Sequence, residues 1–205
     1  MRATLNTMHY PSFFDAVETI KLRDPLADFL GALEGGMVEF SYLDVVKSTG
    51  HSCPTVAGAY LMALYGLKAL YKEEIPVRGE IKVEFKGASE EGVNGVIANV
   101  LTQLTGAATS SGFKGIAGNF ARDNLLSFQD QIDLDVKLTN IITGKSVEVG
   151  YMPQKIAVEP LQNELMEKIK NHSASSEEMQ LFKNLWQKRV EKIFANAADV
   201  INVSA

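Results

Sequence analysis

The stretch that decides the fold runs from Pro54 to Tyr71 and reads PTVAGAYLMALYGLKALY. It holds no acidic residue and a single lysine, and it is rich in Ala, Leu and Met. Small residues interrupt the run and charged residues flank it, so it is not a membrane span. A proline suits the first turn of a helix, where a missing N–H costs nothing. We therefore predict a buried helix that begins at Pro54.

The polar turn before this helix is Gly50-His51-Ser52-Cys53-Pro54, and it contains the only cysteine and one of the three histidines. Cys53 is predicted to lie at the helix N-terminus, where unpaired N–H groups and the helix dipole favour a thiolate. An imidazole two residues earlier can approach the same point. A buried cysteine beside a capping histidine would give the same pattern, so chemical and structural roles both remain open at this turn.

Length and composition indicate one soluble globular protein. The 205 residues are 46% apolar and 22% charged, and they carry a net charge of −5, which suits a single well-buried core. Acidic and basic residues are interspersed, without the cationic surface of a nucleic-acid-binding protein. One cysteine excludes an internal disulfide and fits a reducing cytoplasm. The first 18 residues lack the apolar segment of a signal peptide. We expect a cytoplasmic protein that binds neither nucleic acid nor membranes.

Hydrophobic periodicity outlines the first half of the chain. Helical spacing is present from Phe13 to Lys21, and Asp24 with Pro25 is a good start for a helix through Leu33. In that helix Leu26, Phe29, Leu30 and Leu33 fall on one face, which predicts its burial. Residues 37–46 are rich in β-branched and aromatic side chains and predict a strand that leads toward the turn.

The remainder mixes strands and helices. The predicted elements are a strand at 79–87, a helix at 93–104, a hairpin at 132–151, a short strand at 156–158, and a helix at 179–197 behind a Ser175–Glu178 capping box. No regular βαβ alternation is present, so we predict an α+β fold with a mixed or antiparallel sheet packed against buried helices, and a C-terminal amphipathic helix. Within this single domain we expect an N-terminal helical segment (1–36), an α+β core (37–160) and a C-terminal helical extension (161–205).

Residues 106–118, GAATSSGFKGIAG, form a glycine-rich segment. It lacks the Gly-Lys-Ser/Thr ending of a phosphate-binding P-loop, so a mobile loop is the simpler interpretation, and such a loop can close over a pocket. Ser110 and Lys114 in this loop, together with Asn99 in the preceding helix, are the predicted contacts to a bound ligand. Ordinary surface hydrogen bonds and charges are the alternative for all three.

Two motifs together resemble the FmdE family of formylmethanofuran dehydrogenase proteins. One is the Gly-His-x-Cys-Pro turn followed by a glycine-containing apolar helix. The other is Leu104-Thr105-Gly106 at the end of a second helix, followed by a glycine-rich segment with Gly118-Asn119-Phe120. The likeness covers roughly residues 40–150. It implies an α+β core, a metal-binding turn and a homodimer. Family members are encoded beside a molybdenum or tungsten enzyme in methanogens, or stand alone.

The chain departs from the family pattern at three positions. Val96 and Asn99 stand where the family tends to place cysteine and aspartate, and Ala107 stands where a cysteine is expected. The absence of cysteine after position 53 also excludes the zinc finger that is often appended to the family. His51 and Cys53 therefore carry over as candidate metal ligands, and His9 is a candidate for the third ligand. A partner subunit or a bound cofactor is an equally open source of that third ligand.

These observations predict a metal- or metallocofactor-binding protein with its site at the turn. Imidazole and thiolate suit zinc in the first place, and also copper, nickel or iron. The expected partners are a second copy of the chain, and a small-molecule ligand or a metalloenzyme. The alternative is a metal-assisted or thiol-dependent enzyme that acts on a small polar substrate at the same turn, with Cys53 as nucleophile and His51 as its base.

Overall fold

The computed structural model describes residues 8–204. Their helices and strands, in chain order, are η1 Ser12–Ala16, β1 Ile20–Arg23, α1 Pro25–Phe29, η2 Glu34–Gly36, β2 Met37–Phe40, α2 Tyr42–Thr49, α3 Pro54–Tyr71, β3 Ile81–Phe85, α4 Asn94–Thr105, β4 Leu126–Ser127, β5 Val136–Asn140, β6 Ser146–Tyr151, η3 Pro153–Lys155, α5 Pro160–Lys170, α6 Ser176–Ala195, α7 Ala197–Val200 and β7 Ile201–Ser204. The predicted α+β fold is confirmed. None of the helices in this part of the chain is both long enough and apolar enough to cross a membrane.

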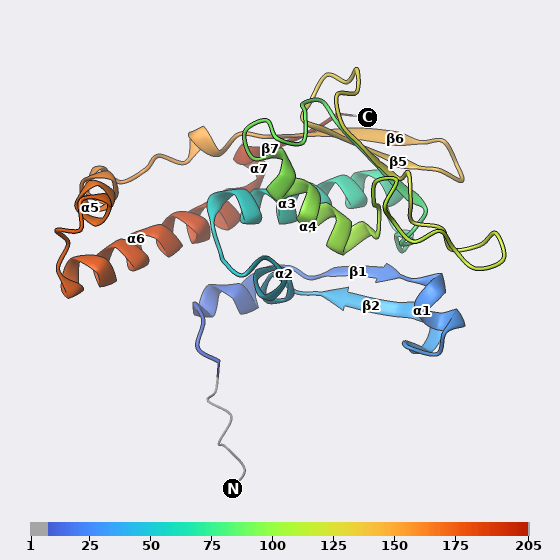
Figure 1. Ribbon diagram of the computed structural model, residues 1–205, viewed down its shortest axis with the longest axis horizontal. Helices are drawn as coiled ribbons and strands as arrows, with labels where there is room; N and C mark the ends of the chain where they lie inside the picture. The colour runs from blue at the N-terminus through green and yellow to red at the C-terminus, as the bar shows by residue number, and fades with distance from the viewer. Residues whose placement is uncertain (1–7, 205) are drawn as a thin grey trace, which may run out of the picture.

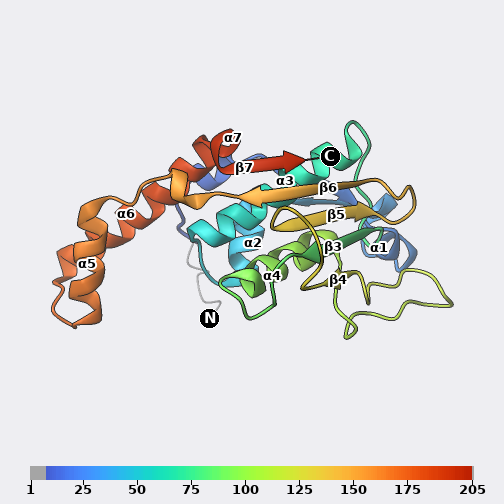
Figure 2. The ribbon, with the colours of Figure 1, turned by 90° about the horizontal axis from the view of Figure 1, so that it is seen from above.

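Three layers build the body of the molecule (Figures 1 and 2). The layer of α3 and α4 lies between a five-stranded sheet and the antiparallel β1–β2 pair. On one side α3 contacts β5, β6 and β7. Toward the other side, the Tyr60 hydroxyl of α3 lies 2.7 Å from the carbonyl oxygen of Glu18 and 3.0 Å from that of Phe40. These contacts make α3 the centre of the fold.

The larger sheet has the strand order β4-β3-β5-β6-β7. Only the β3–β4 pair is parallel, so the sheet is mixed. The predicted alternation in β3 is confirmed, because Ile81, Val83 and Phe85 are fully buried while the residues between them are only partly covered. The hairpin formed by β5 and β6 is confirmed as well, with Val136 opposite Val149.

The small residues of α3 explain how closely it packs on the sheet. A Cβ atom on Gly58 would lie 2.2 Å from Cε1 of Tyr151, and one on Gly66 would lie 2.6 Å from Cδ1 of Leu138. Both distances are far below van der Waals contact, so only glycine admits these side chains at this depth. The glycines that interrupt the apolar run are thus the places where sheet side chains enter the helix surface.

The predicted strand at 37–46 is wrong beyond Phe40, because a helix follows it. Ser41 caps α2: its hydroxyl oxygen accepts from the backbone N–H of Asp44 (3.2 Å), and the Asp44 carboxylate accepts from the backbone N–H of Ser41 (2.9 Å). This reciprocal capping satisfies two helix-terminal donors. It outweighs the strand preference of the Val45-Val46 pair.

Two N-terminal predictions also need correction. The segment 13–21 is not one helix but the short η1 followed by the start of β1. The helix predicted for 24–33 ends at Phe29, although Asp24 does cap it, and its apolar face is not buried. Phe29 and Leu30 are each 61% exposed. Positive φ at Gly31 and Gly35 turns the chain away before a longer helix can form.

The C-terminal region leaves the body and returns to it. α6 follows the predicted Ser175–Glu178 capping box, and its outer end packs against α5, away from the sheet (Figure 1). The chain then forms α7 and β7, which pairs with β6. The predicted strand at 156–158 is absent, because the chain there forms a bend and an irregular link between η3 and α5. Both sheets cross the predicted segment boundaries: β1 pairs with β2 across 36/37, and β7 belongs to the sheet of the core.

Candidate functional site

His51 is fixed by the end of α2. Gly50 ends that helix in the left-handed conformation (φ 77°), and this reverses the chain into the turn. The Nδ1 atom of His51 lies 3.0 Å from the carbonyl oxygen of Thr49. A carbonyl oxygen only accepts, so Nδ1 carries a proton, and in the neutral ring Nε2 is the nitrogen that keeps a lone pair. The side chain is exposed. It can therefore offer Nε2 to a ligand from solvent.

Cys53 is the N-cap of α3. Its sulfur accepts a hydrogen bond from the backbone N–H of Val56 at 3.4 Å, and the side chain is half-buried. The sulfur thus stands where an oxygen of Ser, Thr or Asp usually caps a helix. It lies at the positive end of an 18-residue helix, where negative charge is stabilised.

Ser52, between these two residues, anchors the turn to α6. Its hydroxyl lies 2.9 Å from the Tyr42 hydroxyl and donates to Oε1 of Gln187 at 3.0 Å, and its carbonyl oxygen accepts from Nε1 of Trp186 at 3.0 Å. The Tyr151 hydroxyl donates to the carbonyl oxygen of the next turn residue, Pro54, at 2.7 Å. The turn is consequently held from α2, α6 and the end of β6.

The two tyrosines beside the turn stay protonated. Burial raises the pKa of Tyr42 well above its ordinary value, against the opposing effect of the hydrogen bond with Ser52. Burial likewise raises the pKa of Tyr151, against the opposing charge of Arg189. Sequence patterns do not identify either residue as part of this turn. Periodicity places Trp186 on the apolar stripe of α6, but its hydrogen bond to the turn has no signal in the sequence.

The predicted ligand contacts lie elsewhere. Asn99 lines an open hollow of about 640 Å³ that neither His51 nor Cys53 lines. The hollow lies between α4 and the glycine-rich loop, and its walls include Val96, Thr102, Ala108, Thr109 and Ser111. Ser110 and Lys114 do not line it. The Lys114 ammonium instead donates to the Ser110 carbonyl oxygen and pairs with Asp123 at 2.8 Å.

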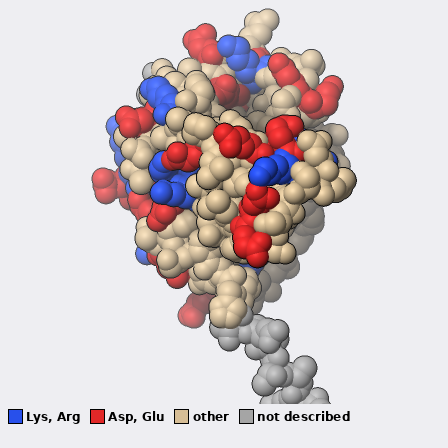
Figure 3. Space-filling view, turned by 90° about the vertical axis from the view of Figure 1, so that its left-hand side faces the viewer, with Lys and Arg blue, Asp and Glu red and all other residues tan. Residues whose placement is uncertain are grey.

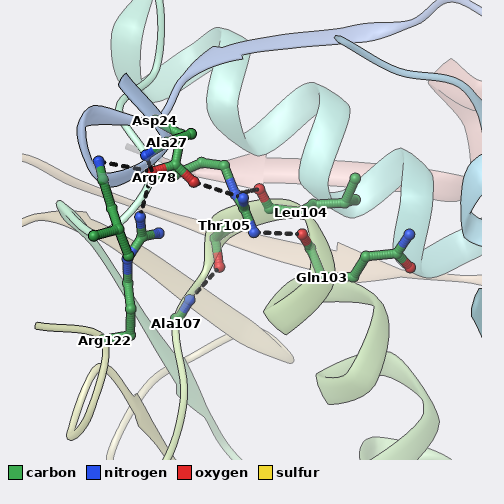
Figure 4. A network of polar contacts seen from close by, with 9 residues as sticks. Asp24, Ala27, Arg78, Gln103, Leu104, Thr105, Ala107 and Arg122 are labelled. Carbon is green, nitrogen blue, oxygen red and sulfur yellow. Dashed lines mark hydrogen bonds and ion pairs between the residues drawn. The ribbon is translucent and has the colours of Figure 1, made fainter. Parts of the chain in front are cut away.

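A buried ion network fixes the loop beside this hollow (Figure 4). The Asp24 carboxylate pairs with Arg78 at 2.7 Å and with Arg122 at 2.6 Å. Arg78 also donates to the carbonyl oxygens of Gln103 (2.9 Å) and Leu104 (3.0 Å) at the end of α4. The Leu-Thr-Gly end of that helix is therefore clamped by arginine, and Arg122 ties the loop to it. The glycine-rich segment is anchored at its base.

Three metal-ligating side chains do not come together. Among residues 8–204, no group of three His, Cys, Asp or Glu side chains is placed to hold a metal ion. His9 is exposed and does not complete such a group with His51 and Cys53. His172 is exposed at the end of α5. The turn itself offers one imidazole and one thiol, from His51 and Cys53.

A family model described as "FmdE, Molybdenum formylmethanofuran dehydrogenase operon" matches residues 49–202. The chain belongs to the FmdE family. The match begins two residues before His51, and it runs beyond the predicted core through α5, α6 and into β7. The FmdE pattern therefore includes α6 and the end of β6, which hold the turn, but not Tyr42 of α2. A comparison with curated proteins found no match.

Proposed function

We propose that this protein binds a transition metal ion, zinc in the first place, or a metal-containing cofactor, through Nε2 of His51 and Sγ of Cys53. The observation that carries the proposal is the Nδ1–H hydrogen bond from His51 to the Thr49 carbonyl. Metal-binding histidines usually donate their second ring N–H in this way, because it fixes the tautomer and orients the ring. The amide of Val56 gives the sulfur a comparable hydrogen bond.

The remaining donors come from outside the described chain. Two protein ligands fit a metal that is shared with a cofactor, with a second copy or with a partner metalloenzyme. A metal ion held by His51 and Cys53 would supply Lewis-acid chemistry to the molecule that completes its coordination. Membership of a family named for a molybdenum-enzyme operon supports a metalloenzyme as the partner.

The test is elemental analysis of protein purified without chelator, alongside Cys53→Ser. Serine is itself a good N-cap, so this variant keeps α3 and changes only the metal donor. We expect up to one metal per chain in the wild type and a loss of at least about tenfold in affinity in the variant. His172→Gln is the matched control, since it removes an exposed imidazole far along the chain. Equal metal content in all three proteins would refute the proposal.

A thiol-dependent enzyme is the second candidate, and the half-buried position of Cys53 at the helix N-terminus favours it. Here the imidazole of His51 would take the proton of the Cys53 thiol, and the resulting thiolate would attack an electrophilic carbon of a small polar substrate and displace its leaving group. Iodoacetamide alkylation of metal-free protein distinguishes the two functions. A rate near pH 7 no faster than that of a model thiol, at equal access, would reject the enzyme.

A further inference from the structure

An apolar groove lies between α5 and α6, on the part of these helices that projects from the body (Figure 1). Met166 of α5 and Phe182, Lys183, Trp186 and Gln187 of α6 line it, and its volume is about 250 Å³. The rings of Phe182 and Trp186 lie 5.6 Å apart at 41° to each other. The groove therefore offers two aromatic surfaces and a thioether to whatever enters it.

This groove adjoins the Gly50–Pro54 turn. Trp186 donates to the Ser52 carbonyl oxygen at 3.0 Å, and Gln187 donates to the same oxygen at 3.2 Å. The two side chains that bond the residue before Cys53 are thus also walls of the groove.

The size and charge of the groove select its occupant. Its volume falls below the roughly 300–1,000 Å³ of pockets for drug-sized ligands, so it suits one ring. Aromatic walls and a methionine sulfur favour an aromatic ring. At the rim Lys183 has no carboxylate partner within residues 8–204, although the nearby Lys168 and Lys170 are paired with Glu178 and Glu167. The face toward which these helices project carries charges of both signs around uncharged surface (Figure 3).

We propose that the groove binds a flat aromatic ring whose anionic substituent pairs with Lys183. This inference rests on the proposed function, because the ring belongs to the small ligand that also reaches the metal at His51 and Cys53. The groove sets the ligand class, and the turn supplies the metal-binding chemistry.

Benzoate is the probe, and Trp186 is the reporter because it is the only tryptophan in the chain. Titration followed by tryptophan fluorescence should saturate, and benzoate should bind at least about threefold more tightly than cyclohexanecarboxylate, which lacks the π-system. Phe182→Leu should weaken benzoate binding about threefold to tenfold. Lys183→Gln should weaken binding of benzoate but not of neutral benzamide. Phe113→Leu, at an exposed phenylalanine outside the groove, is the control and should bind benzoate like the wild type.

A fluorescence response that does not saturate, or one that Phe182→Leu leaves unchanged, would overturn the inference. A tryptophan fluorescence that changes when the protein is diluted, but not when benzoate is added, would also overturn the inference, because a second copy of the chain would then cover the groove. Zinc is measured in the same preparations. If benzoate binds saturably but none of the preparations contains metal, the proposed function is rejected and the inference about the aromatic-ring site stands. Metal that depends on Cys53, without any benzoate effect, rejects the ring site alone.

Discussion

Removal of the Asp24 carboxylate is expected to be the most destabilising single change in the polar network. The residue is 5% exposed, and it pairs with two arginines, of which Arg122 is itself only 8% exposed. The same carboxylate caps α1, because it accepts from the backbone N–H groups of Leu26 (3.0 Å) and Ala27 (3.2 Å). One substitution therefore removes a helix cap and the countercharge of two guanidinium groups.

The size of the stability loss follows from the hydrogen-bond partners that each arginine keeps when the Asp24 carboxylate is removed. Arg78 still donates to two carbonyl oxygens at the end of α4, whereas Arg122 loses the partner of Nη2, and its Nε is already buried without one. Loss of one member of a buried pair costs about 3–5 kcal/mol. Loss of an N-cap costs about 1 kcal/mol on its own. We expect Asp24→Ala to lower the free energy of unfolding by about 3–5 kcal/mol, the cap included.

Urea unfolding followed by circular dichroism measures this free energy. Asp28→Asn, an exposed carboxylate on the same helix, is the control and should change stability by no more than about 0.5 kcal/mol. The double variant Asp24→Asn/Arg122→Met should be more stable than Asp24→Asn alone, because the unpaired buried charge is gone. A loss below about 1 kcal/mol in Asp24→Ala would refute the argument that this network clamps the loop.

Three further predictions concern stability. Gly106→Ala should lower the free energy of unfolding by more than Gly144→Ala, for which we expect a loss of about 1 kcal/mol. Both glycines have positive φ, but only at Gly106 would a Cβ atom meet another side chain, 2.0 Å from Nη1 of Arg122. Equal losses for the two variants in urea unfolding would contradict this. Ser41→Ala should cost about 1 kcal/mol through loss of the α2 cap, and an unchanged unfolding midpoint would show that the capping box is not needed. Burial raises the pKa of Tyr42 above its ordinary 10.0. The stability that the protonated Tyr42 contributes to the fold is therefore complete below about pH 10, and the free energy of unfolding falls by up to about 1.4 kcal/mol per pH unit above that pH. Tyr42→Phe should make the alkaline loss of stability shallower, and an identical pH profile would contradict that.

The sequence predicted best where one pattern persists over a whole element. The run 54–71 is apolar on every side, which predicts a helix that is buried all round, and the strict alternation in β3 predicts a strand that is buried on one face. Ser41 shows where this fails: the capping signal was present in Ser41 and Asp44, yet the β-branched residues that follow favour a strand locally. The free energy of the cap and of packing on α3 decided the outcome, and packing is not local.

The environment of the turn was beyond sequence reasoning for a related reason. Trp186 bonds a residue 134 positions earlier, and Arg122 pairs with one 98 positions earlier. Such contacts depend on how whole elements are placed. Periodicity identified Trp186 as apolar and α6 as amphipathic, but the indole N–H that holds Ser52 is independent of that pattern.

The departures from the family pattern are grouped in space, and this bears on function. Val96 and Asn99 both line the hollow beside α4, and Ala107, fully buried, precedes the loop residues that form its other wall. The positions at which the FmdE likeness led us to expect cysteine and aspartate thus lie around one feature, and the turn with His51 and Cys53 is not part of its lining. At these three positions the chain carries neither a thiolate nor a carboxylate, whereas the hydrogen bonds of His51 Nδ1 and Cys53 Sγ are in place. If His51 and Cys53 hold a metal ion as we propose, these hydrogen bonds orient the two donors, and we expect the remaining donors to come from the molecule that the protein binds.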